Sequence, residues 1–362
     1  MSDPVSQRVE QLVAHGVQVI DPRQTYVAAD VRLERIRPSS TLHPGTRLVG
    51  PRTYVGENAQ IGAEGPATAV DAVFGPDSRI DSGFVHGAVL LRGARLGANA
   101  HVRPGTVLEE GASTAHAVGL KHTVLLAFVT LGSLINFCDV LMAGGTSPTD
   151  HSEVGSGFIH FNFTPWGARG DKATPSLVGN VVAGVLLREP RIFLGGAGGM
   201  IGPRRVGFGA IAAAGQVLRR DVAAGTLALE PHTAVARSIA PGHLDGAQPR
   251  GRRNAEYIAQ LVVLRAWYRQ VRMVRAADDE RVVLAAAVDT LGEAIDERMV
   301  RLCGFLEERG KPMPELHLDP NIACPLELEA STQDHLSWVR GLDDDAVARL
   351  QAWLGAVAAA VA

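Results

Sequence analysis

A chain of 362 residues is long enough for two domains or for one long repeat array. Its formal net charge of −3 gives no general reason to expect nucleic acid or an anionic membrane surface as a partner. The opening MSDPVSQRVEQL lacks an apolar signal core, and no apolar run approaches the roughly 18 residues of a membrane span. The three cysteines, Cys138, Cys303 and Cys324, are too widely spaced to predict a disulfide framework or a zinc site. We therefore expect a cytoplasmic protein.

A short amphipathic helix is predicted from Ser6 to His15, with Gly16 at its end. Its apolar positions are Val9, Leu12 and Val13, which we expect on one face. Extended structure follows.

A strict six-residue repeat organises the next part of the chain. Residues 90–113 read LLRGAR, LGANAH, VRPGTV and LEEGAS, and each unit opens with an aliphatic residue. A helix would place apolar residues three and four apart and an amphipathic strand two apart, so neither alone explains a period of six. The period is typical of a parallel β-solenoid, in which one aliphatic side chain per short strand points into a stacked core. Further positions on this spacing are Leu42, Leu48, Val55, Ile61, Phe74, Ile80, Val206, Ala212 and Leu218.

The middle of the solenoid departs from this pattern. From Val118 to Met142 the sequence is nearly all apolar or small, so we expect a partner subunit or the chain itself to cover these coils. This surface predicts a homotrimer. Residues 146–174 and 194–205 are predicted to be inserted loops, where functional groups are often carried.

The composition changes after Pro241. Helices are predicted near Asn254–Arg275, near Asp278–Glu308 and from Asp334 to the end. Four arginines of the first helix either form a solvated face or contact a phosphate-bearing ligand or an acidic neighbour: Arg265, Arg269, Arg272 and Arg275. We expect the helices to cap the open end of the solenoid, because terminal units of repeat arrays must be capped.

The predicted fold class is therefore mainly β, a parallel β-helix with a C-terminal α-helical extension. The expected units are 1–25 (N-terminal helix and lead-in), 26–240 (solenoid), 241–253 (linker) and 254–362 (helical domain).

The order of several motifs resembles a known enzyme family. ARLGANAHVRPGTVLEEGA is followed by AVGLKHTVL, by VGSGFIHFNF and DKATPSLVGN, and by FGAIAAAGQVLRRDV. This order, over roughly residues 16–222, resembles the C-terminal half of the bacterial bifunctional N-acetylglucosamine-1-phosphate uridyltransferase/glucosamine-1-phosphate acetyltransferases, without the uridyltransferase domain. The resemblance to these hexapeptide acyltransferases implies a left-handed β-helix, a homotrimer with sites between subunits, and acetyl-CoA as the acyl donor.

The resemblance also implies roles for single residues. Arg103 in VRPGTV and Lys121 in GLKHT match the arginine and lysine that bind sugar phosphate in the family. The alternative for both is an ion pair between coils, for example with Glu109 or Glu110. Asn162 in FNF and Lys172 in DKAT match two further substrate-binding positions, although Phe163 replaces the family's tyrosine. The family's catalytic histidine lies in a stretch that corresponds here to SLINFCDVLMAGG, which contains no histidine.

Acetyl transfer to an amine therefore needs a general base from elsewhere in the chain. The candidates are His116, His122, His151 and His160. We prefer His160, because it lies two residues from Asn162 and would share a strand face with it. Counting six from Val154, however, places His160 inward, as a buried structural histidine.

Asp139 in NFCD is either a substitute base or a structural aspartate. His116 and His122 are six apart, and no third histidine has the spacing of the metal-binding gamma-class carbonic anhydrases, so no metal is predicted. For acetyl-CoA, Arg204 and Arg205 would contact the adenosine phosphates. Ala213 and Ala214 would leave a groove for the pantetheine arm.

The sequence thus predicts an acyl-CoA-dependent acetyltransferase that acts on a sugar phosphate or a nucleotide-linked amino sugar. One alternative is a catalytically silent relative that binds a nucleotide sugar as a sensor or scaffold. Another is a UDP-N-acetylglucosamine pyrophosphorylase or other sugar nucleotidyltransferase. LGGAGGMIGPRR superficially resembles a phosphate loop, but it lies inside the solenoid and not at the start of an α/β domain.

Overall fold

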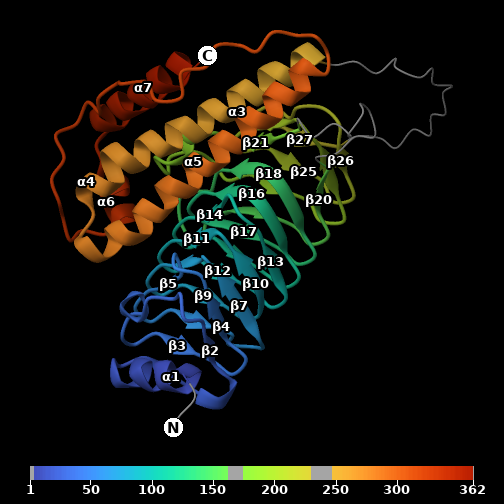
Figure 1. Cartoon of the computed structure of the whole chain (residues 1–362). Coiled ribbons are helices and arrows are strands. Elements are labelled where there is room, and N and C mark those ends of the chain that lie inside the picture. Colours follow the sequence, from blue (N-terminus) through green and yellow to red (C-terminus); the bar gives the residue numbers. More distant parts are fainter. Residues whose placement is uncertain (1–3, 162–173, 230–246, 362) are drawn as a thin grey trace.

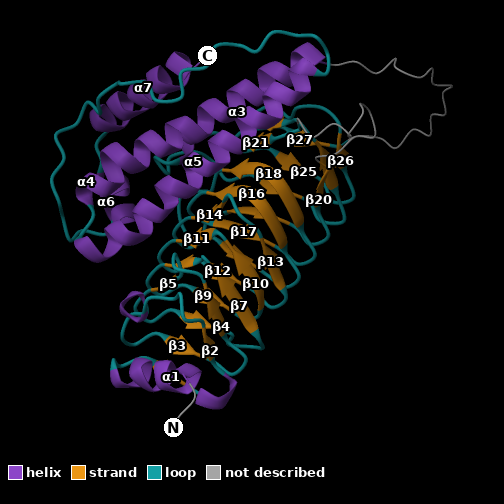
Figure 2. Cartoon of the chain, viewed as in Figure 1, coloured by secondary structure: helices purple, strands orange, loops and turns teal. Residues whose placement is uncertain are grey.

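The computed structural model describes residues 4–161, 174–229 and 247–361. Within these ranges the chain forms a parallel β-solenoid with a helical C-terminal region packed along one side (Figure 1). Figure 2 shows the short strands stacked one above another along the solenoid axis. In the described part of the chain, no helix has the length and apolar character needed to cross a membrane.

The strands stack in three columns, and all pairings between them are parallel. The first column is an eleven-stranded sheet. Its strands are β1 (Gln18–Val19), β3 (Thr41–Leu42), β6 (Gln60–Ile61), β9 (Arg79–Ile80), β12 (Arg95–Leu96), β15 (Ser113–Thr114), β17 (Val129–Leu131), β19 (Ser152–Val154), β22 (Phe193–Leu194), β25 (Ile211–Ala212) and β27 (Leu227–Ala228).

Two long strands, β16 (Gly119–Leu125) and β18 (Asn136–Met142), bridge the second and third columns. The second column also contains β2 (Tyr26–Val27), β4 (Arg47–Val49), β7 (Ala67–Val70), β10 (Gly83–His86), β13 (Ala100–Val102), β20 (Ile159–Phe161), β23 (Gly199–Ile201) and β26 (Val217–Leu218). The third contains β5 (Tyr54–Val55), β8 (Val73–Phe74), β11 (Ala88–Leu90), β14 (Thr106–Leu108), β21 (Ser176–Val178) and β24 (Arg205–Val206).

The six-residue repeat places one apolar side chain per strand in the solenoid core. Leu90, Leu96, Val102 and Leu108 are each no more than 1% exposed. The prediction of a β-solenoid is confirmed, because these inward residues form one continuous core along the whole array.

Helix α1 (Pro4–Ala14) covers the N-terminal end of this core. Val9 and Leu12 are buried in the core, whereas Val13 is 48% exposed. Val13 was expected on the same face, but neighbouring helix residues do not point in the same direction.

The C-terminal helices lie along the side of the solenoid instead of capping its end (Figure 1). Helix α3 (Ala247–Trp267) passes through a π-helical turn, η3 (Tyr268–Arg272), into α4 (Met273–Arg275) and is followed by α5 (Asp278–Glu307). Helices α6 (His335–Gly341) and α7 (Asp344–Val361) complete the region. The remaining short elements are η1 (Pro22–Gln24), η2 (Leu33–Arg35) and α2 (Val181–Gly184).

The helices cover an apolar outer row on the third column. In-register pairing aligns Tyr54, Val73, Val89, Val107, Val124, Leu141 and Leu177. All of them belong to one buried cluster with side chains of α3 and α5. The chain itself therefore covers much of the apolar surface between Val118 and Met142, the surface from which a trimer was predicted.

Two segments expected to be inserted loops contain solenoid strands. Residues 146–174 include β19 and β20, and residues 194–205 continue the coil through β23. The glycines of LGGAGG permit close stacking of successive coils. A Cβ atom on Gly195 would lie 2.4 Å from the Ala214 nitrogen, and one on Gly155 would lie 2.4 Å from the Gly196 nitrogen. Helix α3 begins at Ala247, inside the segment expected to be a linker.

Candidate functional site on the outer face of β13, β16 and β18

Arg103 and Lys121 lie side by side on the solvent face of the second column. Val102 pairs with Leu120 in the parallel register, and the residues that follow them are Arg103, just beyond the end of β13, and Lys121. Val102 and Leu120 are buried, so the alternation of a strand turns the two cations outward. Neighbouring strands are about 4.8 Å apart. The register therefore places two positive charges next to each other.

Among the described residues, no carboxylate forms an ion pair with either cation. The one side-chain contact that involves either cation joins Arg103 Nη2 to Cys138 Sγ at 3.6 Å. Two like charges on adjacent strands destabilise a sheet. This arrangement favours an anion as the third member of the site.

The nearest glutamates in the sequence, Glu109 and Glu110, lie on the opposite side of the coil and face the helices. Arg272 of η3 pairs with both carboxylates, with Nη1 at 3.5 Å from Glu109 Oε1 and Nη2 bonded to Glu110. Tyr268 donates a hydrogen bond of 2.7 Å to Glu109. These glutamates therefore form no ion pair with Arg103 or Lys121. They are the acidic neighbours that were considered for Arg272.

A second row of outward residues lies beside the cations. His101 pairs with Gly119, and Gly119 pairs with Asn136. The imidazole of His101 is exposed and stacks on Phe84, with ring centroids 5.5 Å apart. Gly119 has no left-handed φ that would require glycine, and a Cβ there would meet only ordinary or slightly tight neighbours. Gly119 has no side chain and lies between His101 and Asn136 in the ladder and next to Lys121 in the chain; a Cβ there would lie 3.3 Å from Asn136 Oδ1.

Cys138 lies beside Lys121 on the same face of the sheet. It pairs with Lys121 across the ladder and is 8% exposed. Burial raises the pKa of its thiol, so Cys138 is a neutral neighbour of the two cations.

His160 lies inside the solenoid wall. It is 3% exposed, and its register partner Met200 belongs to the core. Its Nδ1 lies 2.6 Å from the Cys138 carbonyl oxygen and its Nε2 lies 2.8 Å from Ser176 Oγ. A carbonyl only accepts, so Nδ1 carries the proton and Nε2 accepts from the Ser176 hydroxyl. Burial lowers the pKa of His160 to about 4. This geometry favours the structural alternative for His160.

Asp139 lies at the corner between the second and third columns. Asp139 and its neighbour in the ladder, His122, both have left-handed backbones, with φ of 61° and 46°. The Asp139 carboxylate forms an ion pair with Arg298 of α5 at 3.3 Å, and both side chains are at most 4% exposed. Asp139 therefore joins the solenoid to α5.

The residues expected to bind acetyl-CoA lie near the C-terminal coils. Arg205 forms an ion pair with Glu256 of α3, and the Arg204 backbone N–H donates to Ser176 Oγ. Ala213 and Ala214 form the turn between β25 and β26. A Cβ on the adjacent Gly215 would meet nothing within 4 Å, so open space is present beside this turn. Asn162 and Lys172 lie outside the described residues.

His101 and Asn136 were not singled out from the sequence. The sequence could have pointed to His101, because it lies two residues before Arg103 and strand alternation places both side chains on one face. In the described ranges, no cluster of three or more His, Cys, Asp or Glu side chains is arranged to hold a metal ion.

Comparison with known proteins relates the chain to one group of proteins. No protein-family model matches the chain. The Bifunctional protein GlmU of Nocardia farcinica is 30% identical over 221 residues, which are 61% of this chain and 39% of that protein. The Bifunctional protein GlmU of Thermotoga petrophila is 28% identical over 216 residues, 59% of this chain and 42% of that protein. The Bifunctional protein GlmU of Desulfitobacterium hafniense is 29% identical over 218 residues, which are 60% of this chain and 42% of that protein.

The chain spans about two fifths of the length of these relatives, 39% of the first and 42% of the second. Its own matched part is about 60% of its length. This chain therefore resembles the C-terminal half of GlmU, and it folds as the β-solenoid that the resemblance implied.

Proposed function

We propose that the outer face of β13, β16 and β18 binds the phosphate of a sugar phosphate or nucleotide-linked amino sugar. The observation that carries the proposal is the adjacent pair of Arg103 and Lys121, with which no carboxylate of the described residues forms an ion pair. A phosphate would neutralise both charges and accept charge-assisted hydrogen bonds from both side chains. The use of lysine adds support. Among the 35 lysines and arginines only three are lysines, and two of these, Lys121 and Lys172, lie at positions of the family motif.

We further propose that the protein transfers an acetyl group from acetyl-CoA to the bound amino sugar, with His101 as general base. Gly119 lies between His101 and Asn136 in the ladder and adjoins Lys121. An amine held there would attack the thioester carbonyl and pass its proton to His101, the C–S bond would break, and the leaving thiolate would take up that proton. Asn136 would orient the acceptor. The small residues Ala213 and Ala214, with the open space at Gly215, remain the proposed place of the pantetheine arm.

A silent nucleotide-sugar-binding protein is the second candidate. The position of His160 favours it, because the histidine preferred from the sequence is inside the solenoid wall with both ring nitrogens bonded. This candidate shares the phosphate site and differs only in lacking acyl transfer.

Binding is tested by thermal shift of the whole chain with amino-sugar phosphates, UDP-sugars and acetyl-CoA. A ligand at a hundredfold excess over Kd stabilises the native state by about 2.7 kcal/mol. Arg103→Ala and Lys121→Ala should each weaken binding tenfold to a hundredfold or more, since a charge-assisted hydrogen bond contributes about 1.5–3 kcal/mol. Arg95→Ala is the matched control, because Arg95 is exposed on the first column and has no side-chain partner among the described residues. Equal loss in the control would contradict the site.

Acetyl-CoA consumption with each bound sugar separates the two candidates. If His101 is the base, His101→Asn should retain sugar binding and lose about 10²–10⁴-fold in rate. A wild-type protein that binds the sugar and never consumes acetyl-CoA between pH 6 and 9 would establish the silent binder.

A further inference from the structure

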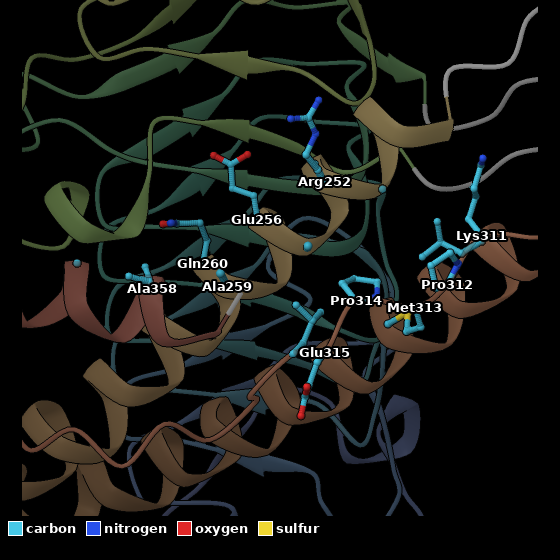
Figure 3. Close-up of a pocket in the computed structure, with 16 residues that line it drawn as sticks. Arg252, Glu256, Ala259, Gln260, Lys311, Pro312, Met313, Pro314, Glu315 and Ala358 are labelled. Carbon is cyan, nitrogen blue, oxygen red and sulfur yellow. The ribbon is translucent and has the colours of Figure 1, made fainter.

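A hollow between the C-terminal helices shares no residue with the proposed sugar site. It is formed by α3, α7, the end of α5 and the segment from Lys311 to Leu316 (Figure 3). Its volume is about 880 Å³. Small-molecule sites span about 300–1,000 Å³, so the hollow has the capacity for a ligand of that class.

Small residues on two facing helices create the space. On α3, Gly251, Ala255 and Ala259 follow one another at intervals of four residues, and on α7 Gly355 and Ala358 face the hollow. A Cβ at Gly355 would meet nothing within 4 Å. The remaining wall includes the apolar side chains of Leu306, Met313 and Leu316. The hollow therefore suits an apolar body.

One buried polar group of the wall has an unused donor. Gln260 lines the hollow and is 8% exposed. Its Oε1 accepts a hydrogen bond of 2.8 Å from the Val181 N–H, which fixes the orientation of the amide. Its Nε2 has no partner among the described residues. Nε2 is not among the buried atoms that lack a partner, so solvent reaches this donor and a ligand acceptor in the hollow would take the place of water there.

The charges around the hollow favour an anion at one end. In Figure 3, Arg252 lies at the top of the pocket and Lys311 at its right, and neither makes an ion pair with a described residue. The Glu256 carboxylate is neutralised by Arg205. The other carboxylate of the lining, Glu315, is exposed and lies on the opposite side.

From these features we propose that the hollow binds a single-chain amphiphile with a carboxylate or phosphate head. The apolar chain lies between the small-residue faces of α3 and α7, and the head contacts Arg252 and Lys311. Gln260 Nε2 donates a hydrogen bond to an oxygen of the ligand.

The test uses calorimetric titration of the whole chain with decanoate, decyl phosphate and 1-decanol, all below their aggregation concentrations. Both anions should bind more tightly than the alcohol, and binding should show the negative heat-capacity change of apolar burial. The double variant Arg252→Gln/Lys311→Gln should bind both anions at least tenfold more weakly than wild type, because it loses the charge-assisted hydrogen bonds to the head group. Its affinity for 1-decanol should stay within about twofold of the wild-type value. The tighter of decanoate and decyl phosphate identifies the head group.

Ala358→Phe and Ala359→Phe fill the hollow from partly exposed and exposed positions, so they should fold and lose all three ligands. Arg95→Gln controls for the loss of an exposed arginine. The proposal is overturned if wild type binds none of the probes or if the filled variants bind them as wild type does. It is also overturned if sedimentation shows that the filled variants change self-association, because the hollow would then be an interface between copies.

Discussion

His160 shows how one residue can match a functional pattern and still be part of the wall. The spacing to Asn162 suggested a shared face, whereas the register places His160 opposite the core residue Met200. Ser176 and the Cys138 carbonyl use both ring nitrogens. Any replacement that cannot make both bonds leaves a buried partner unsatisfied, at a cost of about 1–3 kcal/mol.

The pH dependence of stability follows from this environment. Burial lowers the pKa of His160 to about 4 in the native state. An unfolded histidine titrates near about 6.5, so between these values the unfolded chain binds a proton that the native chain does not. The contribution of His160 to stability is complete above about pH 6.5 and decreases as the pH falls toward 4, by an amount on the order of 3 kcal/mol.

Urea unfolding of wild type and His160→Gln at pH 7.5, 6 and 5 checks this. The variant should be less stable at pH 7.5 and should lose less stability on acidification. Burial also lowers the pKa of His122 to about 4, so part of the slope should persist in the variant. Parallel slopes for the two proteins would contradict a buried neutral His160.

At the scale of elements, the third column and the helices are joined by buried ion pairs. Arg272, at the end of the π-helical turn, is 3% exposed and pairs with Glu109 and Glu110 of the solenoid. Burial raises the pKa of Glu109 to about 7. The free energy of this contact therefore depends on one arginine that compensates two buried carboxylates.

Arg272→Met should lower the free energy of unfolding by about 3–5 kcal/mol, because it leaves both carboxylates buried without a cation. The loss should be largest above pH 7 and smaller at low pH, where the carboxylates take up protons. Arg269→Met is the control, since Arg269 is half exposed and pairs with the exposed Asp319. Denaturant unfolding of both variants at pH 5 and pH 8 measures the difference. Equal effects would contradict the assigned role.

Helix α1 offers a second comparison between adjacent residues. Leu12 is fully buried at the end of the solenoid core, and Val13 is 48% exposed. Leu12→Ala should cost about 2–5 kcal/mol and Val13→Ala about 0.5 kcal/mol or less. Thermal unfolding of the two variants tests whether α1 closes the core. Similar melting temperatures would show that it does not.

At the scale of the whole molecule, an exposed apolar row lies near the C-terminal end of the solenoid. Phe193, Ile211 and Leu227 are paired in register and are 38%, 46% and 61% exposed. The preceding outward residue of the same column is Glu153, so the surface changes from polar to apolar at β22. An aligned apolar row of this kind is typical of an interface.

The homotrimer stays a prediction, and this row is its proposed contact. Sedimentation of the 38.2 kDa chain at micromolar concentration should give the mass of a trimer. Ile211→Lys should reduce that mass to the monomer, because it places a charge in the contact. Arg95→Gln should not change it. A wild-type monomer would contradict the trimer, and a trimeric Ile211→Lys variant would place the contact elsewhere.

The sequence by itself determined the solenoid, because the six-residue period repeats a local requirement for one inward apolar side chain per strand. The outward position of Arg103 and Lys121 was not predicted, although strand alternation, which turns the neighbours of inward residues toward solvent, would have given it. His101 could have been found by the same reasoning.

Only the tertiary structure decided which outer faces are covered and which polar groups are partners. Arg272 and Glu110 are 162 residues apart, and Arg205 and Glu256 come from different elements. The outward apolar residues of the third column carry no local signal that distinguishes a helix of the same chain from another subunit. That choice depends on how α3 and α5 pack, because apolar burial is non-directional and accepts any complementary surface.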